Sequence, residues 1–128
     1  MKVGLFGFGR TGRLVAEEII KDPGVDLVWV VRKSKENNHE WATDFLGQPH
    51  KKQGYFFSME EAMDPSFFRD NPVDAIIDFS STQSVYEYAR AADEGIRIVS
   101  AISHYEAKEI EYLKGLSEKT AVLHSANI

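Results

Sequence analysis

The hexapeptide Gly7-Phe8-Gly9-Arg10-Thr11-Gly12 lies between an apolar run, residues 2–6, and a segment of helical periodicity, residues 12–20. A strand, a glycine turn and a helix in this order predict a cradle for the phosphates of a dinucleotide. The first glycine allows the tight turn, the second lets the backbone approach the pyrophosphate, and the third lets helix and strand pack closely. The start of the helix adds unpaired N–H groups and a partial positive charge. A glycine turn that binds nothing is the alternative.

The composition is that of a soluble globular protein large enough for one domain. Of 128 residues, 43% are hydrophobic and 27% are charged, and the net charge of −5 argues against binding to nucleic acid or to an anionic membrane surface. The sequence has no cysteine, which excludes disulfides and thiolate chemistry. No apolar run approaches the roughly 20 residues of a membrane span. The predicted first strand begins at once, without a signal peptide, so we expect a cytoplasmic protein.

Strands and helices are predicted to alternate along the chain with short connections. The strands are expected at about 2–6, 25–31, 55–57, 73–79, 97–102 and 121–123, and the helices at about 10–21, 40–46, 83–94 and 104–114, with short helical segments after residues 58 and 64. This alternation predicts an α/β fold: a doubly wound, Rossmann-like parallel sheet with helices on both faces, in one domain over residues 1–128. The expected strand order is 3-2-1-4-5-6, with the ligand at the carboxyl ends of the first and fourth strands.

Local signals predict the ends of these helices. The capping boxes Ser58–Glu61 and Ser103–Glu106 are expected to open two helices. Asp64 before Pro65 is the expected N-cap of another, and residues 80–82 are expected to cap the helix over 83–94. Glycines should close two helices, at positions 95 and 115.

The end of the second strand indicates which nicotinamide cofactor fits. An NAD site usually has an acidic residue there for the ribose hydroxyls, but this chain has Arg32 and Lys33, with no carboxylate before Glu36. A basic pair suits the 2′-phosphate of NADPH, and Arg10 and Arg13 could add to it. The sequence therefore predicts a preference for NADPH over NADH, with a solvated basic loop as the alternative.

Two further strand ends carry polar residues. Phe79, Ser80 and Ser81 follow Asp78 after the fourth strand and are expected to face the cofactor. Asp78 itself is either part of this site or a structural carboxylate that ties loop amides. Ala101, Ile102 and Ser103 follow the fifth strand and either reach the nicotinamide amide or form a plain strand end with a helix cap.

No catalytic or metal-binding set is predicted. The four histidines, at positions 39, 50, 104 and 124, have no partners at metal-ligand spacing, and His104 is expected nearest the cleft, as a surface residue. Tyr105 and Lys108 are three residues apart rather than the four of a Tyr-x-x-x-Lys pair, so no proton relay of that kind is expected. We therefore assign no catalytic residue and no metal.

Three motifs together resemble the N-terminal, cofactor-binding domain of the dihydrodipicolinate reductase family. They are Gly9-Arg10-Thr11-Gly12, where the family has Gly-Arg-Met-Gly, then Asp78-Phe79-Ser80, and Ser125-Ala126-Asn127. The resemblance covers essentially the whole chain. It implies that NADH or NADPH donates hydride to a cyclic unsaturated dicarboxylic acid in lysine and diaminopimelate synthesis. The positions it assigns to the cofactor are Phe8 to Thr11, Arg32, Lys33, Phe79 to Ser81 and Ala101 to Ser103.

The chain departs from this family in three respects. Many members have one more residue in the first glycine loop. The family often has Gly-Thr-Thr-Gly where this chain has Ala101-Ile102-Ser103-His104. The family's second domain, which binds and protonates the substrate, would follow the segment at which this chain ends. We therefore expect the substrate domain to be absent and the chain alone to have little or no reductase activity. The apolar surface around residues 121–123 and the last helix would then need cover, which favours a homodimer.

A second resemblance is to the nucleotide-sensing cytosolic domains of potassium transport systems, which are not catalytic. The glycine motif through Arg13, followed by Val15-Ala16-Glu17-Glu18, is similar to that family as well. Those domains usually carry an acidic residue at the end of the second strand, and Arg32 argues against this alternative.

Overall fold

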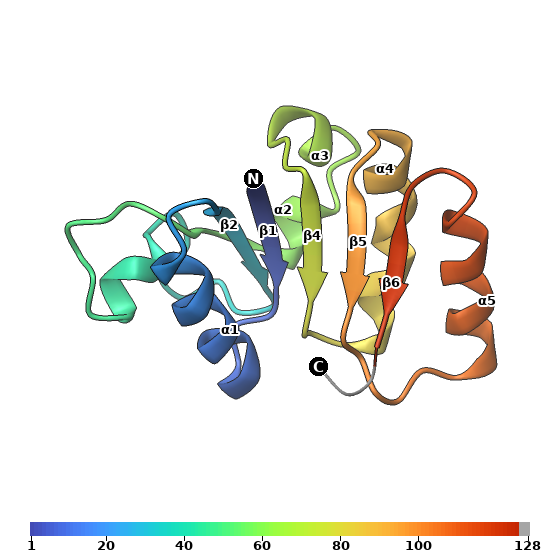
Figure 1. Ribbon diagram of the computed structural model, residues 1–128, viewed down its shortest axis with the longest axis horizontal. Coiled ribbons are helices and arrows are strands. Elements are labelled where there is room, and N and C mark those ends of the chain that lie inside the picture. The colour runs from blue at the N-terminus through green and yellow to red at the C-terminus, as the bar shows by residue number, and fades with distance from the viewer. Residues whose placement is uncertain (126–128) are drawn as a thin grey trace.

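A six-stranded parallel sheet forms the centre of the molecule in a computed structural model that describes residues 1–125 (Figure 1). The strands are β1 (Lys2–Phe6), β2 (Asp26–Arg32), β3 (Tyr55–Ser58), β4 (Ala75–Asp78), β5 (Arg97–Ser100) and β6 (Val122–His124). The helices are α1 (Arg10–Lys21), α2 (Met59–Ala62), α3 (Phe67–Asp70), α4 (Tyr88–Asp93) and α5 (Ala107–Leu116), with 3₁₀ turns η1 (Ala42–Phe45) and η2 (Thr82–Glu87). The strand order β3-β2-β1-β4-β5-β6 confirms the predicted Rossmann-like arrangement.

Side chains that alternate along the strands build a core on each face of the sheet. Under α1, the cluster includes Leu5, Val30 and Phe56, all at most 1% exposed. On the opposite face, which α2, α4 and α5 cover, Phe6 packs against Trp29 and Tyr88 with ring centroids 5.8 and 5.7 Å apart. Because both faces of β1 and β2 are buried, these strands read as continuous apolar runs, and this is why the sequence located them well.

The face of β4, β5 and β6 on the α1 side carries no helix among the described residues (Figure 1). Ile77, Val99 and Leu123 lie in register on it, one on each strand. Leu123 is 59% exposed. We call the patch of these three side chains the uncovered face.

The predicted helix ends are confirmed only in part. The hydroxyl of Ser58 accepts from the N–H of Glu61, whose carboxylate accepts from the N–H of Ser58, so the first capping box forms in full. Asp64, in contrast, does not open a helix: it accepts from the N–H of Ser66 at 2.9 Å in a local turn, and α3 begins only at Phe67. The second capping box also forms at another pair of residues than the predicted Ser103 and Glu106.

That second box pairs Glu106 with Glu109, so α5 begins three residues later than the predicted Ser103 cap would place it. Gly115 lies inside α5 instead of ending it. The helix expected over 83–94 divides into the 3₁₀ turn η2 and the short α4, and Ser81 makes no capping bond. Gly95, with φ +74°, does close α4 as expected.

In the part of the chain that the structure describes, no helix combines the length and apolarity that crossing a membrane requires.

Candidate functional site

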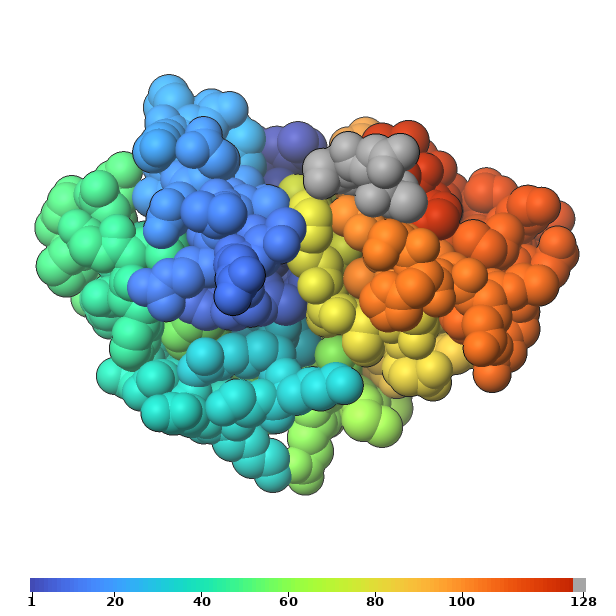
Figure 2. Space-filling model, turned by 90° about the horizontal axis from the view of Figure 1, so that it is seen from below, coloured from blue at the N-terminus to red at the C-terminus, as the bar shows by residue number. Residues whose placement is uncertain are grey.

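The loops after β1, β2, β4 and β5 meet at the carboxyl edge of the sheet. Backbone hydrogen bonds connect them: Gly7 N–H donates to Val31 O at 2.8 Å, Phe79 N–H to Phe6 O at 2.8 Å, and Ala101 N–H to Asp78 O at 3.0 Å. Seen from this edge, the segments after β1 (blue), β2 (cyan) and β4 (yellow) surround a hollow on the surface (Figure 2). The structure thus brings the predicted cofactor residues to one edge.

The three motif glycines differ in what surrounds them. Gly7 has φ +105°, and a Cβ there would lie 3.0 Å from the backbone carbon of Phe79. A Cβ on Gly12 would lie 2.5 Å from the carbonyl oxygen of Gly7, so α1 packs directly on the turn. A Cβ on Gly9 would have no neighbour within 4 Å. The first and third glycines therefore serve packing within the protein, whereas the second faces open space.

The first turn of α1 is free to receive an anion. Gly9 is the N-cap of α1 and has no side chain that could accept hydrogen bonds from the N–H groups of the first turn. The first turn also contains no acidic residue. Arg10 and Thr11 are exposed beside it. Arg13 is engaged within the protein instead, since it donates to Phe45 O and lies over the ring of Phe8.

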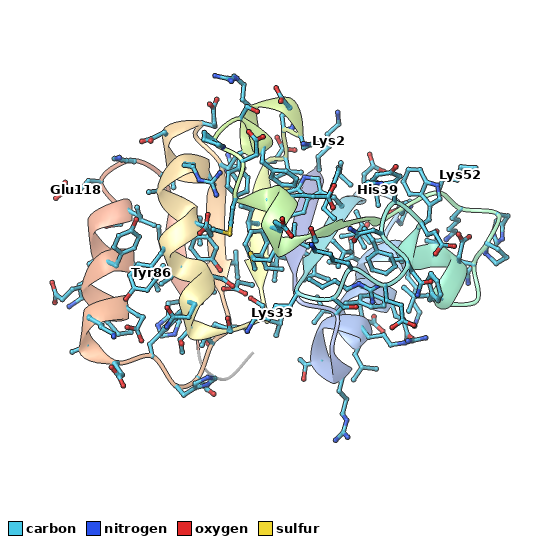
Figure 3. The ribbon with its side chains drawn as sticks, turned by 180° about the vertical axis from the view of Figure 1, so that it is seen from behind. Lys2, Lys33, His39, Lys52, Tyr86 and Glu118 are labelled. Carbon is cyan, nitrogen blue, oxygen red and sulfur yellow. The ribbon has the colours of Figure 1, made fainter. Side chains whose placement is uncertain are left out.

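Arg32 is held at the end of β2 in an orientation that the sequence did not indicate. Its guanidinium lies over the ring of Phe56, 4.1 Å from the centroid, and donates through Nη2 to Glu36 O. Its Nε is buried and has no partner among the described residues. Lys33 is exposed and lies near the tips of the strand arrows in Figure 3, at the carboxyl edge of the sheet. Two cations therefore lie at the end of β2: Arg32, which its contacts hold in place, and the exposed Lys33.

Asp78 is a fully buried carboxylate. Its contacts are those of a structural residue that holds the loop after β4, the second of the two roles predicted for it. It accepts from Ser80 N–H at 2.8 Å, from Ser80 Oγ at 2.5 Å and from the hydroxyl of Tyr88. Burial raises its pKa from 3.8 to about 6, although the bonds from Ser80 oppose this shift. Tyr88 gave no local signal in the sequence, because α4 brings it to Asp78 only in the fold.

These bonds define which groups after β4 remain available. The N–H and hydroxyl of Ser80 are both occupied by Asp78, and its hydroxyl also contacts that of Ser84 at 2.7 Å. The hydroxyl of Ser81 is buried and has no partner among the described residues. Phe79 is half-buried against the α1-side core. Ser80 is therefore engaged within the protein, whereas Phe79 is partly exposed and the buried hydroxyl of Ser81 has no partner among the described residues.

After β5, Ile102 is buried and Ser103 is exposed. The carbonyl oxygen of Ile102 lies 2.9 Å from Nε2 of His124. The ring of Tyr105 packs against that of His124, and its hydroxyl contacts Ser100 Oγ at 2.6 Å. Burial raises the pKa of Tyr105 to about 12, so this hydroxyl is a poor proton donor. Of the third family motif, Ala126 and Asn127 lie outside the described residues.

Within residues 1–125, no three His, Asp or Glu side chains come together as a metal site would require. The residues fit a dinucleotide better. The space in front of Gly9 leaves room for a pyrophosphate beside the N–H groups of α1. Among the described residues, three buried side-chain polar atoms have no hydrogen-bond partner: Ser81 Oγ, Arg32 Nε and Asn38 Oδ1. The first two belong to residues that the sequence assigned to the cofactor.

A family model described as "Dihydrodipicolinate reductase, N-terminus" matches residues 1–128. This match favours the reductase resemblance over the potassium-transport one. None of the curated proteins matches the chain significantly.

Several solved structures share the fold at low sequence identity. A probable dehydrogenase from Thermotoga maritima superposes with a TM-score of 0.73 at 15% identity, over 98% of this chain and 36% of the other. The dipicolinate-bound dihydrodipicolinate reductase from Paenisporosarcina sp. TG-14 gives 0.65 at 16%, over 95% and 46%. A hyperthermophilic archaeal homoserine dehydrogenase in complex with NADPH gives 0.63 at 18%, over 99% and 44%. The chain thus spans less than half the length of each of these proteins.

Proposed function

The chain belongs to the family of the dihydrodipicolinate reductase N-terminus, and from this premise we propose that it binds a nicotinamide dinucleotide, NADPH in preference to NADH, at the carboxyl edge of its sheet. The bound cofactor supplies a hydride. The chain's own residues bind and orient it, and the acceptor, a cyclic unsaturated dicarboxylic acid in the family, would be held by a substrate domain outside these residues. The chain alone should therefore bind cofactor and reduce substrate weakly or not at all.

The single observation that carries this proposal is the contrast between Gly9 and its two neighbouring motif glycines. Gly7 and Gly12 are fixed by contacts inside the protein, whereas Gly9 has open space in front of an uncapped helix start. The fold itself does not require a glycine there, because its φ of −76° suits any residue. A backbone that must approach a pyrophosphate closely gives a reason for it.

Substitution at Gly9 tests this proposal, with a matched control at Gly115. Added methyl groups at both positions would meet nothing within 4 Å, so neither Gly9→Ala nor Gly115→Ala should destabilise the fold by contact. We expect Gly9→Ala to weaken NADPH binding in calorimetric titration by about tenfold, roughly 1.4 kcal/mol, and Gly115→Ala to leave it unchanged. Equal affinities for the two variants would contradict the proposed site.

The preference for NADPH rests on Arg32 and Lys33. A 2′-phosphate beside a fixed guanidinium and a free ammonium would form charge-assisted hydrogen bonds that the 2′-hydroxyl of NADH cannot. We expect the double variant Arg32→Ala/Lys33→Ala to lower the ratio of NADPH to NADH affinity by about tenfold or more at one fixed salt concentration. An unchanged ratio would mean that the two cations form only a solvated loop.

A further inference from the structure

The segment after β2, residues 33–40, is here called the β2 loop, and its backbone is strained. Asn37 and His39 have φ values of +59° and +67°, in the left-handed region that is uncommon for non-glycine residues, although Asn and His adopt it more often than most. Such a conformation persists only where surrounding contacts hold it. The β2 loop contains Lys33 and supplies the carbonyl of Glu36 to Arg32, so its shape determines where both cations lie.

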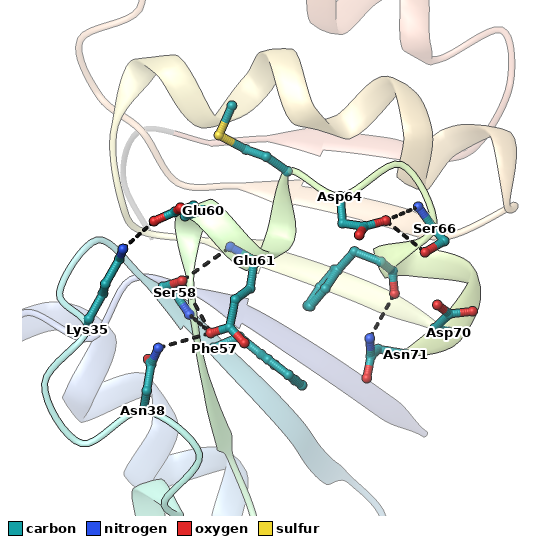
Figure 4. A pocket seen from close by; sticks show the side chains of 12 residues that line it. Lys35, Asn38, Phe57, Ser58, Glu60, Glu61, Asp64, Ser66, Asp70 and Asn71 are labelled. Atoms are coloured by element: carbon teal, nitrogen blue, oxygen red, sulfur yellow. Dashed lines mark hydrogen bonds and ion pairs between the residues drawn. The ribbon is translucent and has the colours of Figure 1, made fainter.

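The side chain of Glu61 contacts two side chains of this loop. The loop backbone also pairs with β3, since His39 N–H donates to Phe56 O and Phe56 N–H donates to Glu40 O, both at 2.9 Å. The Oε1 of Glu61 accepts from Nδ2 of Asn38 at 3.0 Å, and its Oε2 lies 2.7 Å from Nε2 of His39 (Figure 4 shows the contact with Asn38). One of these residues, His39, has a positive φ itself, and the other, Asn38, lies between the two residues with positive φ. A carboxylate that contacts the side chains of two consecutive residues restricts the conformation of the backbone between them.

The side chain of Glu61 is itself held in place by the capping box of α2. The N–H of Ser58 donates to its Oε1 at 3.0 Å in the capping box of α2, and Ser58 is buried at the end of β3. Burial alone would raise the pKa of Glu61, but the bonds from Ser58 and His39 outweigh burial and lower it, so the carboxylate stays charged at neutral pH. This ionised group therefore adds a side-chain contact to the two backbone hydrogen bonds that join the loop to β3.

Packing on this side of the loop comes from the ring of His39, which stacks on Tyr55 with centroids 5.7 Å apart and lies edge-on to Phe57 at 6.0 Å. A cavity of about 730 Å³ lies between the β2 loop and the α2–α3 segment, lined by Lys35 and Asn38 on one side and by residues such as Glu61 and Phe67 on the other. The other side-chain contact across it, the ion pair of Lys35 with Glu60, is exposed on both partners. Exposed pairs contribute little to stability. Glu61 is therefore the side chain across the cavity that contacts two residues of the loop, in addition to the backbone pairing with β3.

We propose that Glu61 is a positioning residue for cofactor selection: it holds the β2 loop in the shape that presents Arg32 and Lys33 to the 2′-phosphate, without contacting the cofactor itself. This inference rests on the proposed NADPH preference. When Glu61 is lost, the loop samples other shapes, and the apparent affinity for NADPH falls by the fraction of time the competent shape is populated. NADH has no 2′-phosphate and depends on that shape much less.

The test compares Glu61→Ala with Glu60→Ala, a neighbouring and exposed carboxylate, by titrating each with NADPH and NADH. We expect Glu61→Ala to lower NADPH affinity about fivefold and to change NADH affinity by less than about twofold, as a competent population near one fifth would require. Glu60→Ala should leave the ratio within about twofold of the wild type. An unchanged ratio in a folded Glu61→Ala protein overturns the inference.

Asn38→Ala provides a second variant that leaves the capping box of α2 intact. It should reproduce part of the loss in NADPH affinity, and the double variant Glu61→Ala/Asn38→Ala should be no worse than Glu61→Ala alone, because both substitutions break the same contact. Additive losses would overturn the inference. A wild type without NADPH preference would overturn the proposed function and this inference together. A preference that Arg32→Ala abolishes and Glu61→Ala spares would overturn the inference alone.

Discussion

Replacing Asp78 with Asn should change how the stability of the protein depends on pH. Asp78 is fully buried at the end of β4 and has no cationic partner among its hydrogen-bond donors, which are Ser80 and Tyr88. Burial raises its pKa from 3.8 to about 6. An acid whose pKa is higher in the folded state binds its proton more tightly there, so folding favours the protonated form.

The sign and size follow from this shift. Below about pH 4 the carboxyl is protonated in both states, and above about pH 6 it is charged in both. Between these limits the folded state binds more protons than the unfolded state, so this group makes the protein less stable as pH rises. A shift of about two pKa units corresponds to roughly 3 kcal/mol in total, most of it lost between about pH 4 and pH 7.

Asp78→Asn removes this titration and keeps the shape of the side chain. Its amide oxygen still accepts from the N–H of Ser80, and its amino group can donate to the hydroxyl of Tyr88. We therefore expect the unfolding free energy of the variant, relative to the wild type, to rise by roughly 2–3 kcal/mol between pH 4 and pH 7.

Urea unfolding followed by tryptophan fluorescence at several pH values measures this difference, and all other titrating groups contribute equally to both proteins. Asp44→Asn, which removes one exposed carboxylate, controls for the change in net charge. Parallel stability profiles for the wild type and Asp78→Asn would refute the reasoning, because they would show that the fold does not perturb this carboxyl.

Three further predictions concern packing and assembly. Gly12→Ala should destabilise the fold by about 1–3 kcal/mol and weaken dinucleotide binding, since its Cβ would lie 2.5 Å from Gly7 O; an unchanged melting temperature would contradict this. Gly4→Ala should cost a similar amount, because its Cβ would lie 2.4 Å from the indole of Trp29, and the smaller ring of Trp29→Phe should recover part of the loss in thermal unfolding. We expect the chain to dimerise through the uncovered face, and Leu123→Glu to shift it to a monomer in light scattering; a monomeric wild type would exclude this assembly.

The sheet could be predicted from sequence because its strands are apolar on both faces and its helices alternate with them. The bounds of β1 and α1 agree with the prediction to the residue, since the glycine motif fixes both ends of the turn between them. Helix starts were harder to predict. Ser103 and Glu106 offer competing caps three residues apart, and packing of α5 selects the second. Local rules cannot rank two acceptable caps.

In the candidate site, too, some features could be predicted from the sequence and others could not. Its residues follow the strands in sequence and were therefore predicted as a set, but their partners come from distant elements. Arg32 lies on Phe56, Asp78 receives the hydroxyl of Tyr88, and the β2 loop is held by Glu61. Each of these contacts forms only when the sheet and its helices pack, so no spacing rule reveals them.

The most direct test of the central claim is to locate the bound cofactor by titrating the isotope-labelled chain with NADPH and following its backbone amides by NMR. The account predicts that the largest shift changes occur at the start of α1, around Gly9 and Arg10, and at Ser81 and Arg32, while amides of α5 stay unchanged. The absence of any change, or changes confined to other parts of the sheet, would contradict the assignment of this edge as the dinucleotide site.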